Sequence, residues 1–331
     1  MIDLHLHLDG SLAPEQVISL ARLQGVSLPA WEPQALTPYL TVPPACKDLN
    51  GYLRCFDLPV SVLQSFEALS LGAEGLARRL AGEGLAYGEI RFAPQLHLQR
   101  GLSQAQAVEA VLQGLKRAEK ACPSFRAQAI LCCMRGGEES LNRETVDAAA
   151  RFLGQGVCAL DLAGAEALYP AEGFRALFAR AASLGVPFTL HAGEAAGPES
   201  VWQALDLGAA RIGHGVRSRE DPRLVERLAR QGIPLELCPT SNVQTRAVRG
   251  FSDFPLREYL GQGIAATLNT DNRTVSDTTL LQEYRRLSVA PQEALALLHN
   301  SARAAFLPAG ERQALRQEVD ARWQAWLSGG E

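Results

Sequence analysis

The feature that most constrains the fold is a regular alternation of short β-rich runs with helical segments. Eight candidate strands recur along the chain, at residues 2–6, 87–92, 127–133, 157–162, 186–190, 210–213, 233–237 and 264–268. Segments with helical periodicity lie between most of them, for example at 105–120 and 199–207. Glycines of the kind that end helices follow several segments, such as Gly208 and Gly232. The alternation predicts an α/β protein with a parallel sheet closed into a (β/α)8 TIM barrel.

Two parts of the chain fall outside the regular alternation. Residues 11–85 form a helical insertion after the first strand, which can cover the mouth of a barrel, and residues 276–327 read as extra C-terminal helices. Periodicity does not reveal whether a sheet closes, so a doubly wound open sheet is the alternative architecture. Because no linker, repeat or low-complexity tract interrupts the 331 residues, we expect a single barrel domain over 1–331.

Composition and charge exclude several classes of function. Hydrophobic residues make up 47% of the chain and charged residues 21%, as in ordinary folded proteins. The net charge of −4 leaves no basic excess for nucleic acid or an anionic membrane. No run approaches 18 apolar residues, so we expect no transmembrane helix. Seven scattered cysteines without a CxxC pair, and a start without a signal-peptide pattern, indicate a reducing, cytoplasmic location.

The few histidines indicate a metal site. His5 and His7 stand at alternate positions of the first strand and therefore point to the same side, either as ordinary core histidines or as metal ligands. His191 and His214 end the fifth and sixth strands, and Asp271 follows the eighth. Barrel active sites lie at these strand ends, and imidazoles with one carboxylate suit a borderline-soft divalent ion. The sequence therefore favours a metal site.

The two remaining histidines serve as a comparison. His97 lies in the loop after the second strand, and His299 lies on a late helix beside Asn300. We expect both to be structural or exposed, and neither to be a metal ligand.

Seven segments, in order and across nearly the whole chain, resemble the adenosine/adenine deaminase family of the amidohydrolase superfamily. They are HLHLDGS at 5–11, EIRFAP at 89–94, DLAG at 161–164, HAGE at 191–194, GHG at 213–215, CPTSN at 238–242 and NTDN at 269–272. Each is weak alone, and together they are specific.

The resemblance implies a zinc site and the groups of a deamination reaction. Its zinc ligands would be His5, His7, His191 and Asp271, with water as a further ligand. Glu194 would give a proton to purine N1, and His214 would orient and deprotonate the water, with Asp271 as the third catalytic residue. Substrate contacts would come from Asp9 to a ribose hydroxyl, the Gly164 backbone N–H to N3, Asn272 to N7, and His7.

Asn272 departs from the family pattern, which usually has a second Asp there. A carboxyl group must be protonated to donate to N7, whereas a carboxamide donates at any pH. Asn272 therefore keeps the contact but leaves substrate preference open, and the alternative is that it only caps its own loop.

The lysines bear on the number of metals. Related two-metal amidohydrolases bridge their ions through a carboxylated lysine at the end of the fourth strand, where this chain reads Leu160-Asp161-Leu162-Ala163. The chain's lysines are Lys47, Lys116 and Lys120, away from that position. The resemblance therefore predicts one Zn²⁺ per chain.

The resemblance favours hydrolytic deamination of adenosine and 2′-deoxyadenosine to inosine and 2′-deoxyinosine with release of ammonia, a purine-salvage reaction. Adenine deaminases of the family tend to have Glu where Asp9 stands, so Asp9 favours a nucleoside over adenine. A 5′-substituted adenosine such as aminodeoxyfutalosine is the other alternative, because the apolar lid expected from Leu53, Phe56 and Leu58 does not separate these substrates.

A non-catalytic zinc or purine-binding protein is a further alternative, which the presence of Glu194 and His214 disfavours. The motifs of cytidine-type deaminases, nucleotide-binding loops, zincins and serine esterases do not occur in the chain. The expected partner is a small purine nucleoside, and the sequence does not indicate the oligomeric state.

Overall fold

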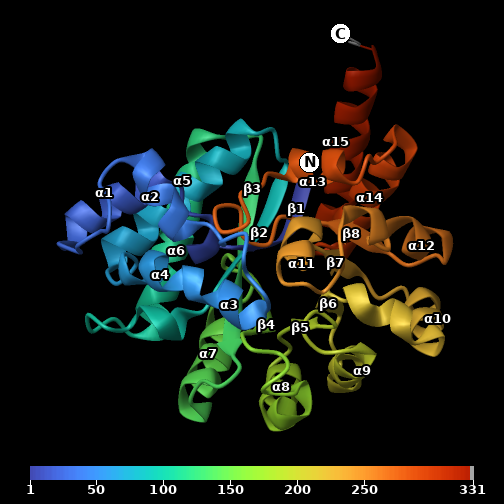
Figure 1. Cartoon of the computed structure of the whole chain (residues 1–331), viewed down its shortest axis with the longest axis horizontal. Helices are drawn as coiled ribbons and strands as arrows, with labels where there is room; N and C mark the ends of the chain where they lie inside the picture. The colour runs from blue at the N-terminus through green and yellow to red at the C-terminus, as the bar shows by residue number, and fades with distance from the viewer. Residues whose placement is uncertain (329–331) are drawn as a thin grey trace.

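Eight parallel strands form the centre of the protein, in a computed structural model that describes residues 1–328. One four-stranded sheet has the order β1-β2-β3-β4 and the other β5-β6-β7-β8. The strands are β1 (Ile2–His7), β2 (Tyr87–Phe92), β3 (Arg126–Met134), β4 (Val157–Ala163), β5 (Thr189–Ala192), β6 (Arg211–His214), β7 (Leu235–Leu237) and β8 (Ala266–Leu268). Figure 1 shows them surrounded by helices.

Backbone hydrogen bonds join the two sheets along both edges. At one edge, Leu160 N in β4 donates to Pro187 O before β5, at 3.0 Å. At the other, Asp271 N donates to His5 O and His7 N donates to Asp271 O, both at 2.7 Å. Single parallel bridges lie at the same two places. The predicted (β/α)8 barrel is thus confirmed over the open-sheet alternative.

The predicted strands are found at all eight places, but β5, β7 and β8 begin later than expected. The predicted ranges were 186–190, 233–237 and 264–268, and the observed ones are Thr189–Ala192, Leu235–Leu237 and Ala266–Leu268. Pro187 and Pro234 lie just before β5 and β7 and have no N–H to donate to a ladder. Their carbonyls still accept from Leu160 N and Ile212 N of the preceding strands.

The outer helices place their apolar faces on the barrel. They are α6 (Gln104–Ala121), α7 (Glu139–Phe152), α8 (Arg175–Ser183), α9 (Pro198–Leu207), α10 (Pro222–Gln231) and α12 (Leu256–Gly261). In α10, Leu224, Val225 and Leu228 are buried. Asp221 caps its first turn and Gly232, with φ of 64°, ends it, as the sequence predicted for this glycine.

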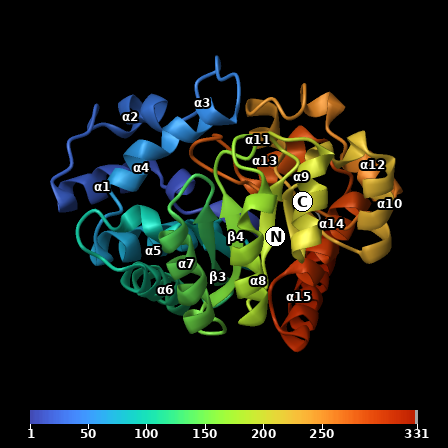
Figure 2. The same cartoon turned by 90° about the horizontal axis from the view of Figure 1, so that it is seen from below.

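The insertion after β1 reaches the mouth of the barrel. It contains α1 (Pro14–Gln24), α2 (Pro33–Leu40), α3 (Leu49–Leu53), α4 (Asp57–Ser61) and α5 (Phe66–Gly82). Helix α5 packs along α6. In Figure 2, α2 and α3 lie at the same end of the molecule as α11 and α13. Leu53 and Phe56 line the cavity at this end as expected of a lid, whereas Leu58 packs against the hydrophobic core instead.

The last two helices close the opposite end. After α11 (Pro239–Gln244), β8 and α13 (Leu280–Arg286) come α14 (Pro291–Ala304) and α15 (Ala309–Ser328). Leu298, Leu315 and Val319 from this region form an apolar cluster with Ile2 and Leu4 of β1.

Short 3-10 helices complete the described elements: η1 (Asp9–Ser11), η2 (Arg54–Phe56), η3 (Pro94–His97), η4 (Ala171–Phe174), η5 (Val216–Glu220) and η6 (Phe251–Asp253). Among residues 1–328, no helix has the length and apolar character needed to cross a membrane. A single domain over 1–331 stays a prediction.

Candidate active site

A cavity of about 590 Å³ lies at the carboxyl ends of the strands. Its lining includes every predicted site residue except His5, which is fully buried. These lining residues are His7, Asp9, Gly164, His191, Glu194, His214, Asp271 and Asn272. The barrel thus brings residues from β1, β4, β5, β6 and the segment after β8 to one place, although their roles stay predictions.

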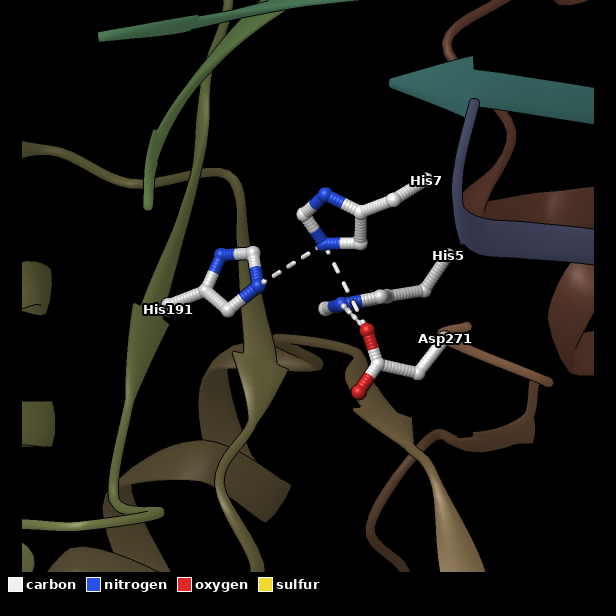
Figure 3. A group of neighbouring side chains, drawn as sticks. All are labelled: His5, His7, His191 and Asp271. Atoms are coloured by element: carbon white, nitrogen blue, oxygen red, sulfur yellow. Dashed lines mark hydrogen bonds and ion pairs between the residues drawn. The ribbon is translucent and has the colours of Figure 1, made fainter. Parts of the chain in front are cut away.

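Four side chains form a group able to hold a metal ion: the ligand atoms of His5, His7, His191 and Asp271 lie within 4.8 Å of one another. Figure 3 shows the three rings and the carboxylate turned toward a common centre. The Asp271 Oδ1 atom is 3.4 Å from His7 Nε2 and 3.5 Å from His5 Nε2. His7 Nε2 is also 3.3 Å from His191 Nε2.

The hydrogen-bonding state of these atoms favours a bound cation at their centre. His5 Nε2 is buried and has no hydrogen-bond partner, which is costly for a polar atom. The Nε2 atoms of His7 and His191 face each other, so their lone pairs repel unless a proton or a cation lies between them. Three imidazole nitrogens and a carboxylate are a common donor set for a divalent transition metal.

Two buried carboxylates orient the rings of His5 and His191. Glu236 Oε2 lies 2.7 Å from His5 Nδ1, and Asp161 Oδ2 lies 2.8 Å from His191 Nδ1. Each carboxylate accepts the Nδ1 proton and so leaves Nε2 with a free lone pair toward the centre.

Two buried arginines balance these carboxylates. Arg91 bonds both Asp161 and Glu236 at 2.8 Å, and Arg211 Nε lies 2.6 Å from Glu236. Burial alone would raise the pKa of Asp161, but His191 and Arg91 lower it far below its usual range. Burial likewise opposes the charge of Glu236, and Arg211 and Arg91 hold its pKa well below normal. Both carboxylates therefore remain ionised.

The supporting residues were missed as functional residues in the sequence. Arg91 and Asp161 belong to two of the segments that resemble the family, but neither residue was assigned a role from the sequence. Glu236 was not identified as a functional residue at all. The available signal was charge inside β-rich runs, because charged side chains are rarely fully buried unless they are paired.

Asp271 is attached to β1 through its backbone as well as its side chain. Its N–H donates to His5 O and its carbonyl accepts from His7 N, so the carboxylate is held beside the histidine pair. Asp271 has φ of 58° and His214 φ of 61°, in the left-handed region that is unfavourable for residues other than glycine. Such strain is typical of functional sites, where surrounding contacts enforce it.

Cys238 joins His214 and Asp271 in a second group with metal-ligand spacing. Burial raises the pKa of its thiol well above the usual value, followed by the negative charges of Asp271 and Asp3. The thiolate needed for metal binding is therefore disfavoured, and the histidine group fits a metal better.

Glu194 and His214 form a buried acid and base pair beside the metal-ligand group. Glu194 Oε2 lies 3.5 Å from His214 Nε2, and Thr245 Oγ1 donates to Glu194 Oε1 at 3.0 Å. Burial, followed by the charges of Asp271 and Glu166, raises the pKa of Glu194 well above normal. Burial, followed by His5, lowers the pKa of His214 well below normal. At neutral pH, the carboxyl can donate a proton and the imidazole can accept one.

Asn242 can support either tautomer of His214. The amide nitrogen Nδ2 of Asn242 lies 3.0 Å from His214 Nδ1. Because a carboxamide offers both an acceptor and a donor, one orientation leaves the His214 Nε2 lone pair free toward the cavity.

The predicted purine contacts also line the cavity. Asp9 is buried, and burial raises its pKa to about 6. Gly164, directly after β4, has φ of 102°, a conformation available to glycine. Asn272 Oδ1 has no hydrogen-bond partner, so it caps no backbone N–H. A Cβ at Gly10 would come within 1.9 Å of that oxygen, and only glycine gives Asn272 room there.

The two comparison histidines lie away from this group. His97 is buried, and its Nδ1 is 2.9 Å from Leu63 O. His299 Nε2 is 2.6 Å from Asp320 on α15. Neither belongs to a metal-ligand group among residues 1–328.

Known proteins resemble the chain over nearly its whole length. A model of the family described as Adenosine deaminase matches residues 1–322. The adenosine deaminase of Haemophilus ducreyi is 52% identical, with 98% of this chain and 96% of that protein covered. Adenine deaminase from Arthrobacter aurescens has 30% identity and a TM-score of 0.87, with 98% of each chain covered. Arabidopsis ADAL, solved in complex with IMP, has 25% identity and a TM-score of 0.86, over 98% of this chain and 97% of that one.

The barrel and its metal-ligand group define an amidohydrolase-type enzyme, a hydrolase. The chain belongs to the adenosine deaminase family.

We expect Asp161→Asn to weaken metal binding by about 10- to 100-fold, because the amide is a poorer acceptor for the His191 Nδ1 proton. Competition with a chromophoric chelator measures the affinity. Asp147→Asn removes a similar carboxylate from an exposed pair with Arg180 and should leave metal affinity unchanged. Equal affinity in both variants would show that Asp161 does not tune the site.

Proposed function

We propose that the protein deaminates adenosine and 2′-deoxyadenosine hydrolytically, giving inosine or 2′-deoxyinosine and ammonia. The observation that carries this proposal is the buried pair of Glu194 and His214 beside a metal-ligand group in one cavity. Such a pair supplies one proton donor and one acceptor at neutral pH, as hydrolysis of an aromatic amine requires. Membership of the adenosine deaminase family supports this chemistry.

We propose one Zn²⁺ per chain, held by His5, His7, His191 and Asp271. When bound, zinc supplies a water whose pKa is lowered from 15.7 to about 7, so that a nucleophile is available without strong base. Lys47, Lys116 and Lys120 lie outside the barrel strands, which leaves no lysine on β4 to bridge a second ion.

The reaction at C6 depends on two proton positions. Glu194 donates to purine N1, because protonation there reduces the electron density that opposes attack on the ring. His214 accepts a proton from the attacking water at Nε2 and orients its oxygen toward C6. Asp271 holds its negative charge beside His214 and stabilises the protonated ring. His214 then gives its proton to the C6 amine, which leaves as ammonia, and the remaining hydroxyl proton returns to Glu194 as the C6 carbonyl forms.

The remaining contacts orient the nucleoside. The Gly164 N–H donates to N3, and the Asn272 amide donates to N7, so opposite edges of the purine are held. Asp9 accepts from a ribose hydroxyl, and the His7 ring contacts the substrate from the cavity wall. Leu53 and Phe56 cover the ribose from the insertion. In this assignment, the single partner is a small purine nucleoside, and we propose a cytoplasmic location.

A 5′-substituted adenosine is the second candidate, because the cavity has further polar lining beyond the purine contacts. Asp57, Ser61, Gln95 and Gln99 line it together with the insertion side chains. None of the lining residues from the described part of the chain is Lys or Arg. This lining favours an uncharged 5′ substituent over a phosphate.

A substrate comparison tests the proposed function. We expect the kcat/KM of the zinc enzyme for adenosine to exceed that for adenine, AMP and aminodeoxyfutalosine by at least about tenfold. Loss of adenine absorbance follows all four reactions. A higher kcat/KM for aminodeoxyfutalosine would establish the second candidate, and turnover of none of them would contradict the proposal.

We expect Glu194→Gln to lower kcat by about 10²- to 10⁴-fold, because the amide cannot deliver a proton to N1. Zinc content should stay at the wild-type value, since Glu194 is outside the metal-ligand group. Thermal unfolding and metal analysis serve as controls. Near wild-type turnover would refute the role of Glu194 as proton donor.

We expect Asp9→Ala to lower kcat/KM for adenosine by at least about tenfold more than for free adenine, because only the nucleoside has the ribose hydroxyl. The measurement is the ratio of the two kcat/KM values in the variant and the wild type. An equal loss on both substrates would assign Asp9 a role other than ribose recognition.

A further inference from the structure

Glu166 lies in the loop after β4, two residues beyond Gly164, and is 3% exposed. Its carboxylate accepts four consecutive backbone N–H groups of the loop after β5. Oε1 accepts from Gly193 at 2.6 Å, and Oε2 accepts from Glu194 at 3.1 Å, Ala195 at 2.6 Å and Ala196 at 3.0 Å. A single side chain thus accepts hydrogen bonds from four backbone N–H groups in the turn that contains Glu194.

We propose that Glu166 is a positioning residue that fixes the Glu194 carboxyl relative to Gly164, and so sets the geometry with which the two loops meet the pyrimidine edge of the purine. The inference rests on the proposed deamination. No role was assigned to Glu166 from the sequence.

The four hydrogen bonds explain why Glu166 can control this geometry. Gly193 has φ of 71°, and the Arg217 N–H donates to its carbonyl at 3.0 Å, so the turn is also held from η5. The N–H groups of such a turn converge on an anion, and an ionised carboxylate binds them more strongly than a neutral acceptor does. Without that anion, the turn would have four donors in a largely buried place and no common acceptor.

The hydrogen bonds of Glu166 also connect the two groups proposed to donate to the purine, the Gly164 N–H and the Glu194 carboxyl. Gly164 donates to N3 and Glu194 donates to N1, and these atoms are separated by only one ring carbon. A small displacement of one loop against the other would therefore spoil both contacts together. Glu166 connects these loops directly, because its own backbone belongs to the β4 loop and its carboxylate holds the β5 loop.

The negative charge of Glu166 also acts on the Glu194 carboxyl. The groups that face Glu194 are Glu166, Asp271, His214, Asn242 and Thr245. Burial is the largest cause that raises the pKa of Glu194, and the charges of Asp271 and Glu166 raise it further. Glu166 therefore favours the protonated form that the proposed reaction needs.

The test begins with Glu166→Gln, which is nearly the same size but neutral and offers one oxygen in place of two. We expect kcat for adenosine to fall by about 10- to 100-fold, with a smaller change in KM. Because a like charge is removed, the alkaline limb of the kcat profile should move to lower pH by about 0.5–1 unit. Zinc content should not change.

A matched control removes a carboxylate that also accepts a backbone N–H but lies far from the cavity. Glu119 on α6 accepts from Ala127 N at 2.8 Å, at the start of β3. We expect Glu119→Gln to leave kcat and the pH profile unchanged. A loss equal to that of Glu166→Gln would mean that general weakening of the fold explains the effect.

A double-mutant cycle with Glu194→Gln separates positioning from an independent structural role. If Glu166 acts through Glu194, adding Glu166→Gln to Glu194→Gln should change kcat by less than about twofold. Multiplication of the two single losses would overturn the proposal.

If Glu166→Gln does not fold, Glu166→Asp replaces it, because it keeps the charge on a shorter side chain. It should lower kcat while leaving the alkaline limb near its wild-type position.

The outcomes distinguish this inference from the proposed function. A wild-type enzyme that turns over none of the four compounds refutes the deamination itself. A wild-type enzyme that turns over at least one of them, with a Glu166→Gln variant of unchanged kcat and pH profile, refutes only the role of Glu166.

Discussion

The buried charge network beneath the cavity is the constraint on which the rest of the site depends. Glu236 and Asp161 hold the Nδ1 atoms of His5 and His191, while Arg91 and Arg211 neutralise the two carboxylates. Ions without water are stable only when they are paired and hydrogen-bonded, so each member requires the others. The network places charged residues inside β2, β4, β6 and β7, and it determines which nitrogen of each ring faces the proposed metal.

Burial has opposite consequences for two neighbouring groups. It disfavours the ionised form of Glu194 and the protonated form of His214, and thereby prepares one as a donor and the other as an acceptor. Nearby charges adjust this balance, since Asp271 and Glu166 both repel an ionised Glu194. The proposed chemistry thus uses few residues in the cavity, but their protonation states depend on many residues that surround it.

Much of the fold was predictable from local patterns. Strand propensity and helix-ending glycines located all eight strands, and the late starts of β5 and β7 fall where Pro187 and Pro234 have no N–H to donate to a ladder. His5 and His7 were recognisable because strand alternation points both the same way. Glu236 and Glu166 were not, because an isolated glutamate in the sequence looks the same whether it faces solvent, a histidine or a row of backbone N–H groups.

The sequence by itself determined the alternation of strands and helices, the family, and the residues predicted for the metal and the purine. Only the tertiary structure decided how they meet. Backbone hydrogen bonds of Asp271, as donor to His5 and as acceptor from His7, join the segment after β8 to β1, although these residues are far apart in the chain. Local propensity acts between near neighbours, whereas closure, burial and the partners of a buried charge depend on contacts across the whole barrel.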